Sequence, residues 1–493
     1  MQKYLFLAAL AAAPYLACAT ELPETPEQWR QAAIDDIEAG YRITQDNHPG
    51  PHDRANPGFN GNLSAARKVG LAYAARASDA RGYDAAILAF NARVKDGHAG
   101  MFPNLPDSGS VQQQWPGFVA AWRGDALYVY DAINNTPAKG ARIVSCDGIP
   151  IRELVTSNVF AFKSLADVDG MWWDHARRLF MDGGNPFTVR PKRCSFELAG
   201  QKSDLALQWE PVTEQGRQWY HASYNGDRLP IGLSEPRPGL IWVAMPTFQP
   251  DAQGRAAYES LYADMNAGRQ RLLSARAVVV DLRHNLGGSS LWSLKFSGAL
   301  WGDARMERQQ AAYFARTETW YRVTPDNTRH FAKLLDEFKR NGQADAEYWA
   351  RVILENMQAS QKRGEPWAVS RNPAPAPGNP ETDADGDPAP FTRPLYVVVP
   401  GQCASACLDA LDYFTRFPNT RLIGAPSSAD SNYMEVRLQK LDSGRATVIV
   451  PTKVYVNRPR ANGEFYKPAI VVDALDWSTQ NLVEVVEADL KKH

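Results

Sequence analysis

Ser405 has the setting that best suits nucleophilic chemistry in this sequence, because it stands between two alanines in Pro400-Gly-Gln-Cys-Ala-Ser405-Ala-Cys407. The short, β-branched apolar run Leu395–Val399 before it predicts a strand buried on both faces. Apolar residues spaced from Leu408 to Phe414 predict a helix after it. The amide of Ala406 would then point out of a helix N-terminus, where developing negative charge is favoured. The plainer interpretation is that this serine only caps the helix.

A second strand, glycine turn and helix precede this one in the chain. The apolar run Ala277–Asp281 leads into Leu282-Arg-His-Asn-Leu-Gly287-Gly288, and a helix is predicted over Leu291–Leu300. Two glycines allow a turn with exposed amides at a helix start, which is the geometry of an oxyanion hole. The alternative is an ordinary tight connection. The turn lacks the lysine of a Walker loop and the glycine spacing of a dinucleotide fingerprint.

His98 is the third residue that could do chemistry. A helix predicted over Tyr83–Val94 ends in Lys95-Asp96-Gly97-His98, where Gly97 supplies the stop signal and leaves His98 just beyond the helix. Such a histidine is free to act as a proton acceptor for whatever packs against it. As a lone histidine it is equally typical of a cap or a surface residue.

Length and composition bound the class of protein. A chain of 493 residues with 44% hydrophobic residues is expected to form two or three domains. The formal net charge of −1 and the pI near 6.7 give no electrostatic reason to expect nucleic acid or an anionic membrane as a partner.

The N-terminus is typical of an export signal. One lysine is followed by the apolar segment Tyr4–Ala19, which ends in the small-x-small site Ala17-Cys-Ala19 and is too short to span a membrane. We expect cleavage near Ala19 and a periplasmic or extracellular protein. Cys18 offers lipidation as an alternative. No later stretch predicts an integral membrane segment in the mature chain.

Four cysteines remain after this cleavage. An even number in an exported chain suggests disulfides, and four cysteines allow three pairings. We favour Cys146 with Cys194 and Cys403 with Cys407. A Cys-x3-Cys spacing without partner histidines is weak evidence for zinc. The acidic run Asp383–Asp387 only partly matches a calcium loop and is better interpreted as a solvated linker. We therefore expect no metal and no cofactor.

Changes in periodicity along the chain suggest where the domains begin and end. After a helical N-terminal region, short alternating strands predict a β-rich module that includes Thr188–Val189, and an α/β pattern follows, with a helix over Ala256–Leu273. A charged helical insertion and a Pro/Asp-rich loop interrupt the α/β pattern. The expected divisions are 1–19 signal peptide, 20–105 helical region, 106–212 β-rich domain, 213–304 first core segment, 305–371 helical insertion, 372–391 loop and 392–493 second core segment.

Taken in order, Asp-Gly-His98, Asp281-Leu-Arg-His-Asn-Leu-Gly-Gly288 and Ala-Ser405-Ala resemble the motifs of the C-terminal processing (tail-specific) serine peptidase family. The resemblance covers roughly residues 80–475. It implies an α/β fold with a crotonase/ClpP-like peptidase core, an N-terminal helical segment and an inserted PDZ-like domain. Domains of that kind bind peptide termini by strand addition.

The family has two kinds of active site. Tail-specific members carry a Ser/Lys pair, with the lysine in a turn beyond the nucleophile, but the corresponding stretch here, Ala425–Asp430, has no lysine. The tricorn-like branch, which resembles retinoid-binding proteins, uses a histidine before the PDZ-like domain and a glutamate late in the chain. His98 and Glu464 match those positions. The sequence departs from this pattern at Gly97, where a serine is usual, and at His284 and Leu286, where glycine is usual.

The resemblance therefore implies an exported serine peptidase acting on peptides or unfolded protein. His98 would take the proton of Ser405, Glu464 would orient the imidazole, and the amides of Ala406 and of Gly287 or Gly288 would hold the oxyanion. His284 is an alternative base. The competing function is a non-catalytic binding protein for peptides or apolar ligands on the same scaffold. An α/β-hydrolase esterase is disfavoured because Ala-Ser-Ala departs from the Gly-x-Ser-x-Gly elbow.

Overall fold

The computed structural model describes residues 22–105, 112–371 and 389–492. The predicted signal segment with its cleavage site near Ala19, and the acidic run Asp383–Asp387, lie outside the described residues.

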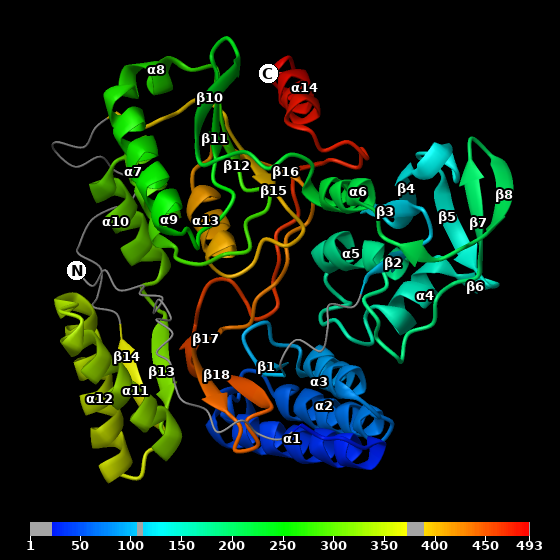
Figure 1. Cartoon of the computed structure of the whole chain (residues 1–493). Helices are drawn as coiled ribbons and strands as arrows, with labels where there is room; N and C mark the ends of the chain where they lie inside the picture. The colour runs from blue at the N-terminus through cyan, green and yellow to red at the C-terminus, as the bar shows by residue number, and fades with distance from the viewer. Residues whose placement is uncertain (1–21, 106–111, 372–388, 493) are drawn as a thin grey trace.

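The centre of the molecule is a six-stranded sheet with the strand order β10-β11-β12-β15-β16-β19 (Figure 1). From β11 to β19 every neighbouring pair is parallel, and β10 joins β11 antiparallel. The predicted strands before the glycine turn and before the serine turn, 277–281 and 395–399, are confirmed with the same bounds. The six strands are β10 Gly232–Arg237, β11 Leu240–Ala244, β12 Ala277–Asp281, β15 Leu395–Val399, β16 Thr420–Gly424 and β19 Ile470–Val471.

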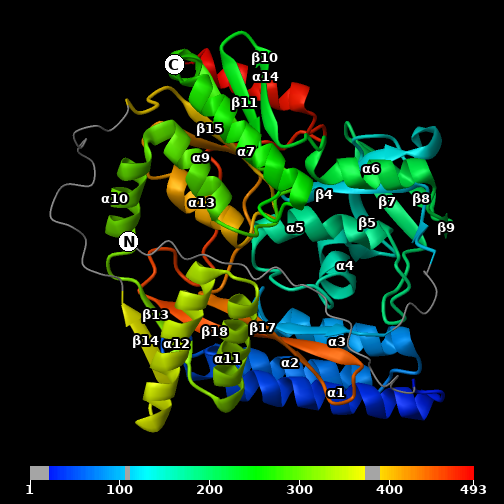
Figure 2. The ribbon, with the colours of Figure 1, turned by 60° about the vertical axis from the view of Figure 1, so that its left-hand side comes forward.

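Helices cover both faces of this sheet, which confirms an α/β core. Successive residues of β11 point to opposite faces, so that Ile241 packs with the helices of one side and Trp242 with those of the other. The turned view shows α14 on the other side of the strands from α7 and α9 (Figure 2). These helices are α7 Ala252–Ala267, α8 Arg269–Ser274, α9 Leu291–Trp301, α13 Ala406–Phe414 and, on the opposite face, α14 Thr479–Leu490.

The N-terminal helices form a layer against a second sheet, of order β1-β18-β13-β14 with β17 paired to β18. Phe90 and Ile37 of the helices share one buried cluster with Val448 and Val450 of β18. The elements are α1 Pro26–Asn47, α2 Phe59–Ala74, α3 Ala80–Val94, β1 Gly100–Pro103, β13 Glu318–Arg322, β14 Trp367–Arg371, β17 Tyr433–Lys440 and β18 Ala446–Val456.

The β-rich module is a sheet of order β3-β4-β5-β7-β8 flanked by short helices. β3 forms one edge and is buried along its whole length, with η3 and α6 packed on it, whereas β8 forms the other edge and is mostly exposed. Its elements are β2 Gln114–Trp115, β3 Phe118–Arg123, β4 Ala126–Ala132, η2 Ile133–Asn135, β5 Arg142–Cys146, β6 Ile149–Pro150, α4 Ile151–Asn158, α5 Asp169–His175, η3 Ala176–Phe180, β7 Arg193–Leu198, β8 Gln201–Ala206, β9 Glu210–Pro211 and α6 Glu214–Asn225.

Several local predictions were wrong. Residues 188–189 follow a turn and form no strand, because both the N–H and the hydroxyl of Thr188 donate to the carbonyl of Asn185. The helix predicted over 256–273 is split at Gly268 into α7 and α8. The charged stretch 305–371 is not purely helical. It contributes β13 and β14 to the second sheet, alongside α10 Asp303–Tyr313, α11 Pro325–Arg340 and α12 Ala344–Lys362.

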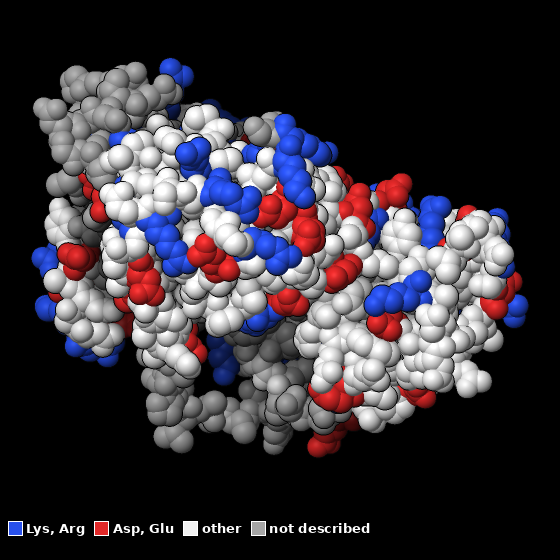
Figure 3. All heavy atoms as spheres, turned by 90° about the horizontal axis from the view of Figure 1, so that it is seen from above, with Lys and Arg blue, Asp and Glu red and all other residues white. Residues whose placement is uncertain are grey.

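The surface beside the top edge of the central sheet carries Lys/Arg and Asp/Glu side chains intermingled, without a large patch of one sign (Figure 3). Within the described ranges, no helix has the length and apolar character needed to cross a membrane.

Candidate active site

Ser405 lies in the turn that connects β15 to α13. Its backbone has φ 55° and ψ −126°, a conformation that residues with a side chain rarely adopt. Strained residues of this kind are concentrated at functional sites, where the surrounding structure holds them. Here the turn is bracketed by the Cys403–Cys407 disulfide, and the N–H of Cys407 donates to the carbonyl of Ala404.

Gly287 is packed directly against this serine. Because β12 and β15 are adjacent and parallel, the turns that follow them meet at the same edge of the sheet. A Cβ added to Gly287 would lie 2.9 Å from Ser405 Cβ and 2.6 Å from the carbonyl oxygen of Ala404. With φ at +102°, this position requires glycine both for its conformation and for the space.

Two of the three predicted oxyanion donors have free amides in the described part of the chain. The N–H of Gly287 donates to Asn285 Oδ1 at 2.9 Å, while those of Gly288 and Ala406 have no acceptor among the described residues. Gly288 is pinned by the strand-like bridge to Phe248, whose carbonyl accepts the N–H of Ser289. Among the three predicted donors, the amides of Gly288 and Ala406 are therefore the two without an acceptor in the described chain.

His98 lies in the loop between α3 and β1, with a side chain that is 19% exposed. Its backbone N–H donates to Asp96 Oδ1 at 2.9 Å, and its ring Nδ1 lies 4.0 Å from the same oxygen. Nδ1 is buried and has no hydrogen-bond partner in the described chain. The His98 ring therefore lies beside a carboxylate, and its Nδ1 makes no hydrogen bond with the described chain.

Asp430 connects this histidine region to the nucleophile. Its Oδ2 accepts the backbone N–H of Ser405 at 2.5 Å, and its Oδ1 lies 4.0 Å from the place where a Cβ on Gly97 would stand. Burial raises the pKa of Asp430, against the lowering effect of the nearby His98 and Arg460 charges. Asp430 is thus a buried carboxyl group that binds the backbone of Ser405 and whose pKa the charge of His98 affects.

Asp96 is the second buried carboxylate of the site. Besides His98, it binds the hydroxyl of Ser431, 2.7 Å from its Oδ1, and the Nε2 of His48, 2.9 Å from its Oδ2. Burial raises the pKa of Asp96, but the hydrogen bond from His48 and the charge of the nearby His98 outweigh it, and the net pKa is lowered. Asp96 therefore stays ionised.

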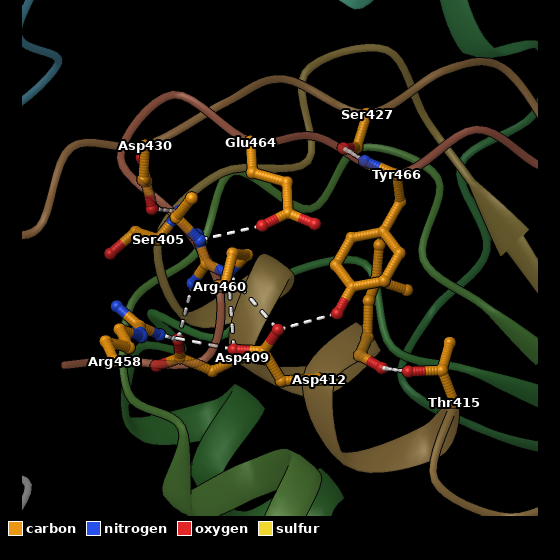
Figure 4. A network of polar contacts seen from close by, with 12 residues as sticks. Ser405, Asp409, Asp412, Thr415, Ser427, Asp430, Arg458, Arg460, Glu464 and Tyr466 are labelled. Atoms are coloured by element: carbon orange, nitrogen blue, oxygen red, sulfur yellow. Dashed lines mark hydrogen bonds and ion pairs between the residues drawn. The ribbon is translucent and has the colours of Figure 1, made fainter. Parts of the chain in front are cut away.

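A buried ion network supports the far side of the serine turn (Figure 4). Asp409 and Asp412 of α13 bind Arg458 and Arg460 from the segment after β18; Arg460 Nε lies 3.2 Å from both oxygens of Asp412. The phenol of Tyr466 donates to Asp412 Oδ1 at 2.6 Å. The segment 458–466 is thereby fastened to the helix that begins at the nucleophile.

Comparisons with known proteins relate this geometry to a fold. Neither a scan against protein-family models nor a search of curated protein sequences finds a match. Among solved structures, mature CPAF superposes with a TM-score of 0.59 at 13% identity, covering 93% of this chain and 96% of that one. The chain has the fold of CPAF. CPAF complexed with lactacystin gives a TM-score of 0.56, also at 13% identity, covering 94% and 99% of the two chains.

The other solved structures include proteases with weaker overlap. The photosystem II D1 C-terminal processing protease covers 90% of this chain and 93% of its own at 13% identity, with a TM-score of only 0.34. That score is too low to carry an argument, so the comparison shows the CPAF fold and nothing finer.

Glu464, the predicted third catalytic residue, is exposed and lies on the segment fastened by the ion network. Its Oε2 accepts the N–H of Ala461 at 2.7 Å (Figure 4). Among the described residues it makes no ion pair with His98. The alternative base, His284, has its Nε2 3.0 Å from the carbonyl of Asp227, and burial lowers its pKa. Lys453 lies further along than the stretch Ala425–Asp430 that lacks a lysine. Its tyrosine and glutamate neighbours outweigh burial and raise its pKa, which does not suit a general base.

The other predicted site residues are the four cysteines. The structure pairs them as Cys146–Cys194 and Cys403–Cys407. Within the described ranges, no cluster of three or more His, Cys, Asp or Glu side chains could hold a metal ion.

Sequence reasoning did not single out Asp96 or Asp430. Each stands beside a candidate position, Asp96 two residues before His98 and Asp430 at the end of the stretch that lacks the family's lysine. A carboxylate next to a candidate base is a signal that could have been used, but the burial of these two loops comes from tertiary packing.

Proposed function

We propose that this protein is an exported serine peptidase that cuts peptides or unfolded protein. The observation that carries the proposal is the strained Ser405 backbone packed against Gly287, with the free amides of Ala406 and Gly288 beside it. The CPAF fold supports it at the level of architecture. The substrate class follows from the resemblance described for the sequence.

In this proposal His98 accepts the proton of Ser405 Oγ as the oxygen bonds to the carbonyl carbon of the substrate. The oxyanion that forms accepts hydrogen bonds from the amides of Ala406 and Gly288, and one such donor contributes roughly 3 kcal/mol of transition-state stabilisation. His98 returns the proton to the leaving amine as the carbon–nitrogen bond breaks. Water then repeats the two steps on the acyl-enzyme.

The resemblance implies that a carboxylate orients the imidazole, and Glu464 is the candidate that the sequence offers for it. The Glu464 carboxylate accepts a hydrogen bond from the Ala461 N–H. To orient His98, it would have to break this bond and bind the imidazole instead. Asp96 and Asp430 are carboxylates already beside the histidine loop.

The β-rich module is proposed to guide substrate. A PDZ-like domain binds peptides by adding a strand to a sheet edge. At the β3 edge, η3 and α6 pack against the strand, whereas β8 is the exposed edge of the same sheet. We therefore place peptide addition, if this module binds by its backbone, at β8.

Covalent labelling with a fluorophosphonate probe tests the catalytic assignment. Wild type is expected to label, and Ser405→Ala and His98→Ala are not. Ser195→Ala, which removes a hydroxyl from the β-rich module, should label like wild type. A folded wild type that neither labels nor cleaves an unfolded reporter protein would support the binding protein instead.

Export is tested separately. The full-length chain, expressed in a bacterial host, should appear outside the cytoplasm with a new N-terminus next to Ala19. An intact N-terminus in the cytoplasmic fraction contradicts this aspect of the proposal.

A further inference from the structure

In the described chain, hydrogen bonds and one peptide link connect the end of the first N-terminal helix to the nucleophile. It begins at His48, whose side chain is fully buried between the rings of Phe59 and Tyr433. His48 Nδ1 accepts the N–H of Gly50 at 2.8 Å, so its proton is on Nε2 and is donated to Asp96 Oδ2. These two hydrogen bonds fix the orientation of the His48 ring, which anchors one oxygen of Asp96.

The other oxygen of Asp96 binds residues of the two loops that carry His98 and Ser431. It accepts the backbone N–H of His98 and the hydroxyl of Ser431, and it is the carboxylate oxygen that lies 4.0 Å from the unpartnered Nδ1 of His98. Asp96 is only 4% exposed, so the imidazolium formed during catalysis would meet a negative charge that water screens little.

Ser431 links Asp96 to the nucleophile. It binds Asp96 through its hydroxyl, and the residue before it in the chain, Asp430, binds Ser405. The carboxylate of Asp430 holds the N–H of Ser405, whose backbone conformation is strained. Asp430 also stands 25 residues beyond Ser405, in the stretch where the Ser/Lys members of the resembled family carry their lysine. The two acids therefore control the base and the nucleophile from adjacent loops.

We propose that Asp96, rather than Glu464, is the carboxylate that positions His98, and that Asp430 is the residue that holds the backbone of Ser405, with Ser431 joining the two. This inference rests on the proposed function, since it assigns positioning residues to the same site. It deepens that function by predicting what controls its pH range.

Titratable and charged groups from several described segments act on this pair. His48 faces Asp96 from the segment after α1, and Tyr433 lies beside it from β17. Arg460 from the segment after β18 and Asp409 from α13 act on Asp430. Replacing Asp96 by asparagine keeps the shape and one acceptor oxygen, but it turns the other acceptor into an NH2 donor and removes the charge next to His98.

The experiment compares the rate of fluorophosphonate labelling against pH for wild type, Asp96→Asn and Glu464→Gln. Asp96→Asn should label about 100-fold more slowly, the scale of a general-base contribution. The acid limb of its pH profile should move to lower pH, because the protonated ring loses a negative neighbour. Glu464→Gln should keep the limb of wild type. A purely structural role of Asp96 would lower the amplitude without moving the limb.

Asp36→Asn is the matched control for loss of a buried aspartate. Asp36 is 3% exposed and binds Tyr83 and Arg445, in the same layer of the molecule but away from Ser405. The Asp36→Asn variant should show the same pH profile of labelling as wild type. An Asp96→Asn enzyme with the wild-type profile, together with loss of labelling in Glu464→Gln, overturns the inference.

Failure of the proposed function is distinguishable from failure of this inference. If wild type does not label at all, the peptidase proposal fails, and histidine NMR decides the positioning question on the same variants. A His98 ring whose titration moves to lower pH in Asp96→Asn supports the assignment, and one that titrates as in wild type overturns it.

Discussion

Gly287 and Ser405 are in contact across two different crossover turns, so closely that a Cβ on the glycine would lie 2.9 Å from the Cβ of the serine. Gly287→Ala should therefore push the nucleophile out of line and distort a backbone at φ +102°. A displacement of about 1 Å can cost about 100-fold in rate. We expect labelling of Ser405 to fall by at least that factor while the circular dichroism spectrum stays unchanged. Gly342→Ala, at an open turn with positive φ and far from Ser405 in sequence, controls for backbone strain alone.

Leu286 is expected to contribute to substrate binding rather than to chemistry. Its side chain is 68% exposed although it precedes Gly287 at the nucleophile. Leu286→Ser should raise KM for peptides with apolar residues near the cut and leave kcat nearly unchanged, because an apolar interaction that is equally strong in the ground state and the transition state affects binding only. Steady-state kinetics on two peptides that differ in one apolar side chain measures this. Equal effects on both peptides would argue against it.

Asp412 is expected to be the most sensitive member of the ion network. It is fully buried and binds Arg458, Arg460 and Tyr466. Asp412→Ala leaves two buried guanidinium groups short of a partner and should destabilise the protein by about 3–5 kcal/mol. Tyr466→Phe removes one hydrogen bond to a charged group and should cost about 2 kcal/mol. Thermal unfolding of both variants checks the order, and a larger loss for Tyr466→Phe would contradict it.

His330 predicts a loss of stability in mild acid. Burial, followed by the charges of Arg437 and Lys333, lowers the pKa of His330 from 6.5 to about 4. Between these values the unfolded chain binds a proton that the folded chain does not, so stability falls as the pH drops from about 6.5 to about 4. Such a difference corresponds to about 3 kcal/mol. His330→Gln should unfold at a melting temperature that changes less over this range than that of wild type.

A pH dependence that is the same in wild type and in His330→Gln would show that other groups dominate. His52, His175 and His284 also have lowered pKa values through burial, and they act in the same direction. The expected result is therefore a smaller slope in the variant, not its disappearance.

Local patterns were sufficient for the strands and turns of the core. The apolar runs Ala277–Asp281 and Leu395–Val399 lie within the chain as continuous buried strands, and their glycine and serine turns follow at once, so sequence alone predicted both. β13 and β14 could not be predicted in this way. They lie in a charged stretch and form only by pairing, β14 with β13 and β13 with β18, a strand that comes much later in the chain.

The same division applies to the candidate site. The types and order of His98, the glycine turn and Ser405 were enough to propose a nucleophile, a base and oxyanion donors, because each occupies a recognisable end of a helix or strand. Which carboxylates stand beside them was decided by tertiary structure. Asp96 and Asp430 are brought together by the sheet that joins β1, β17 and β18, and they matter only because packing removes them from water, where a carboxylate's charge would be screened.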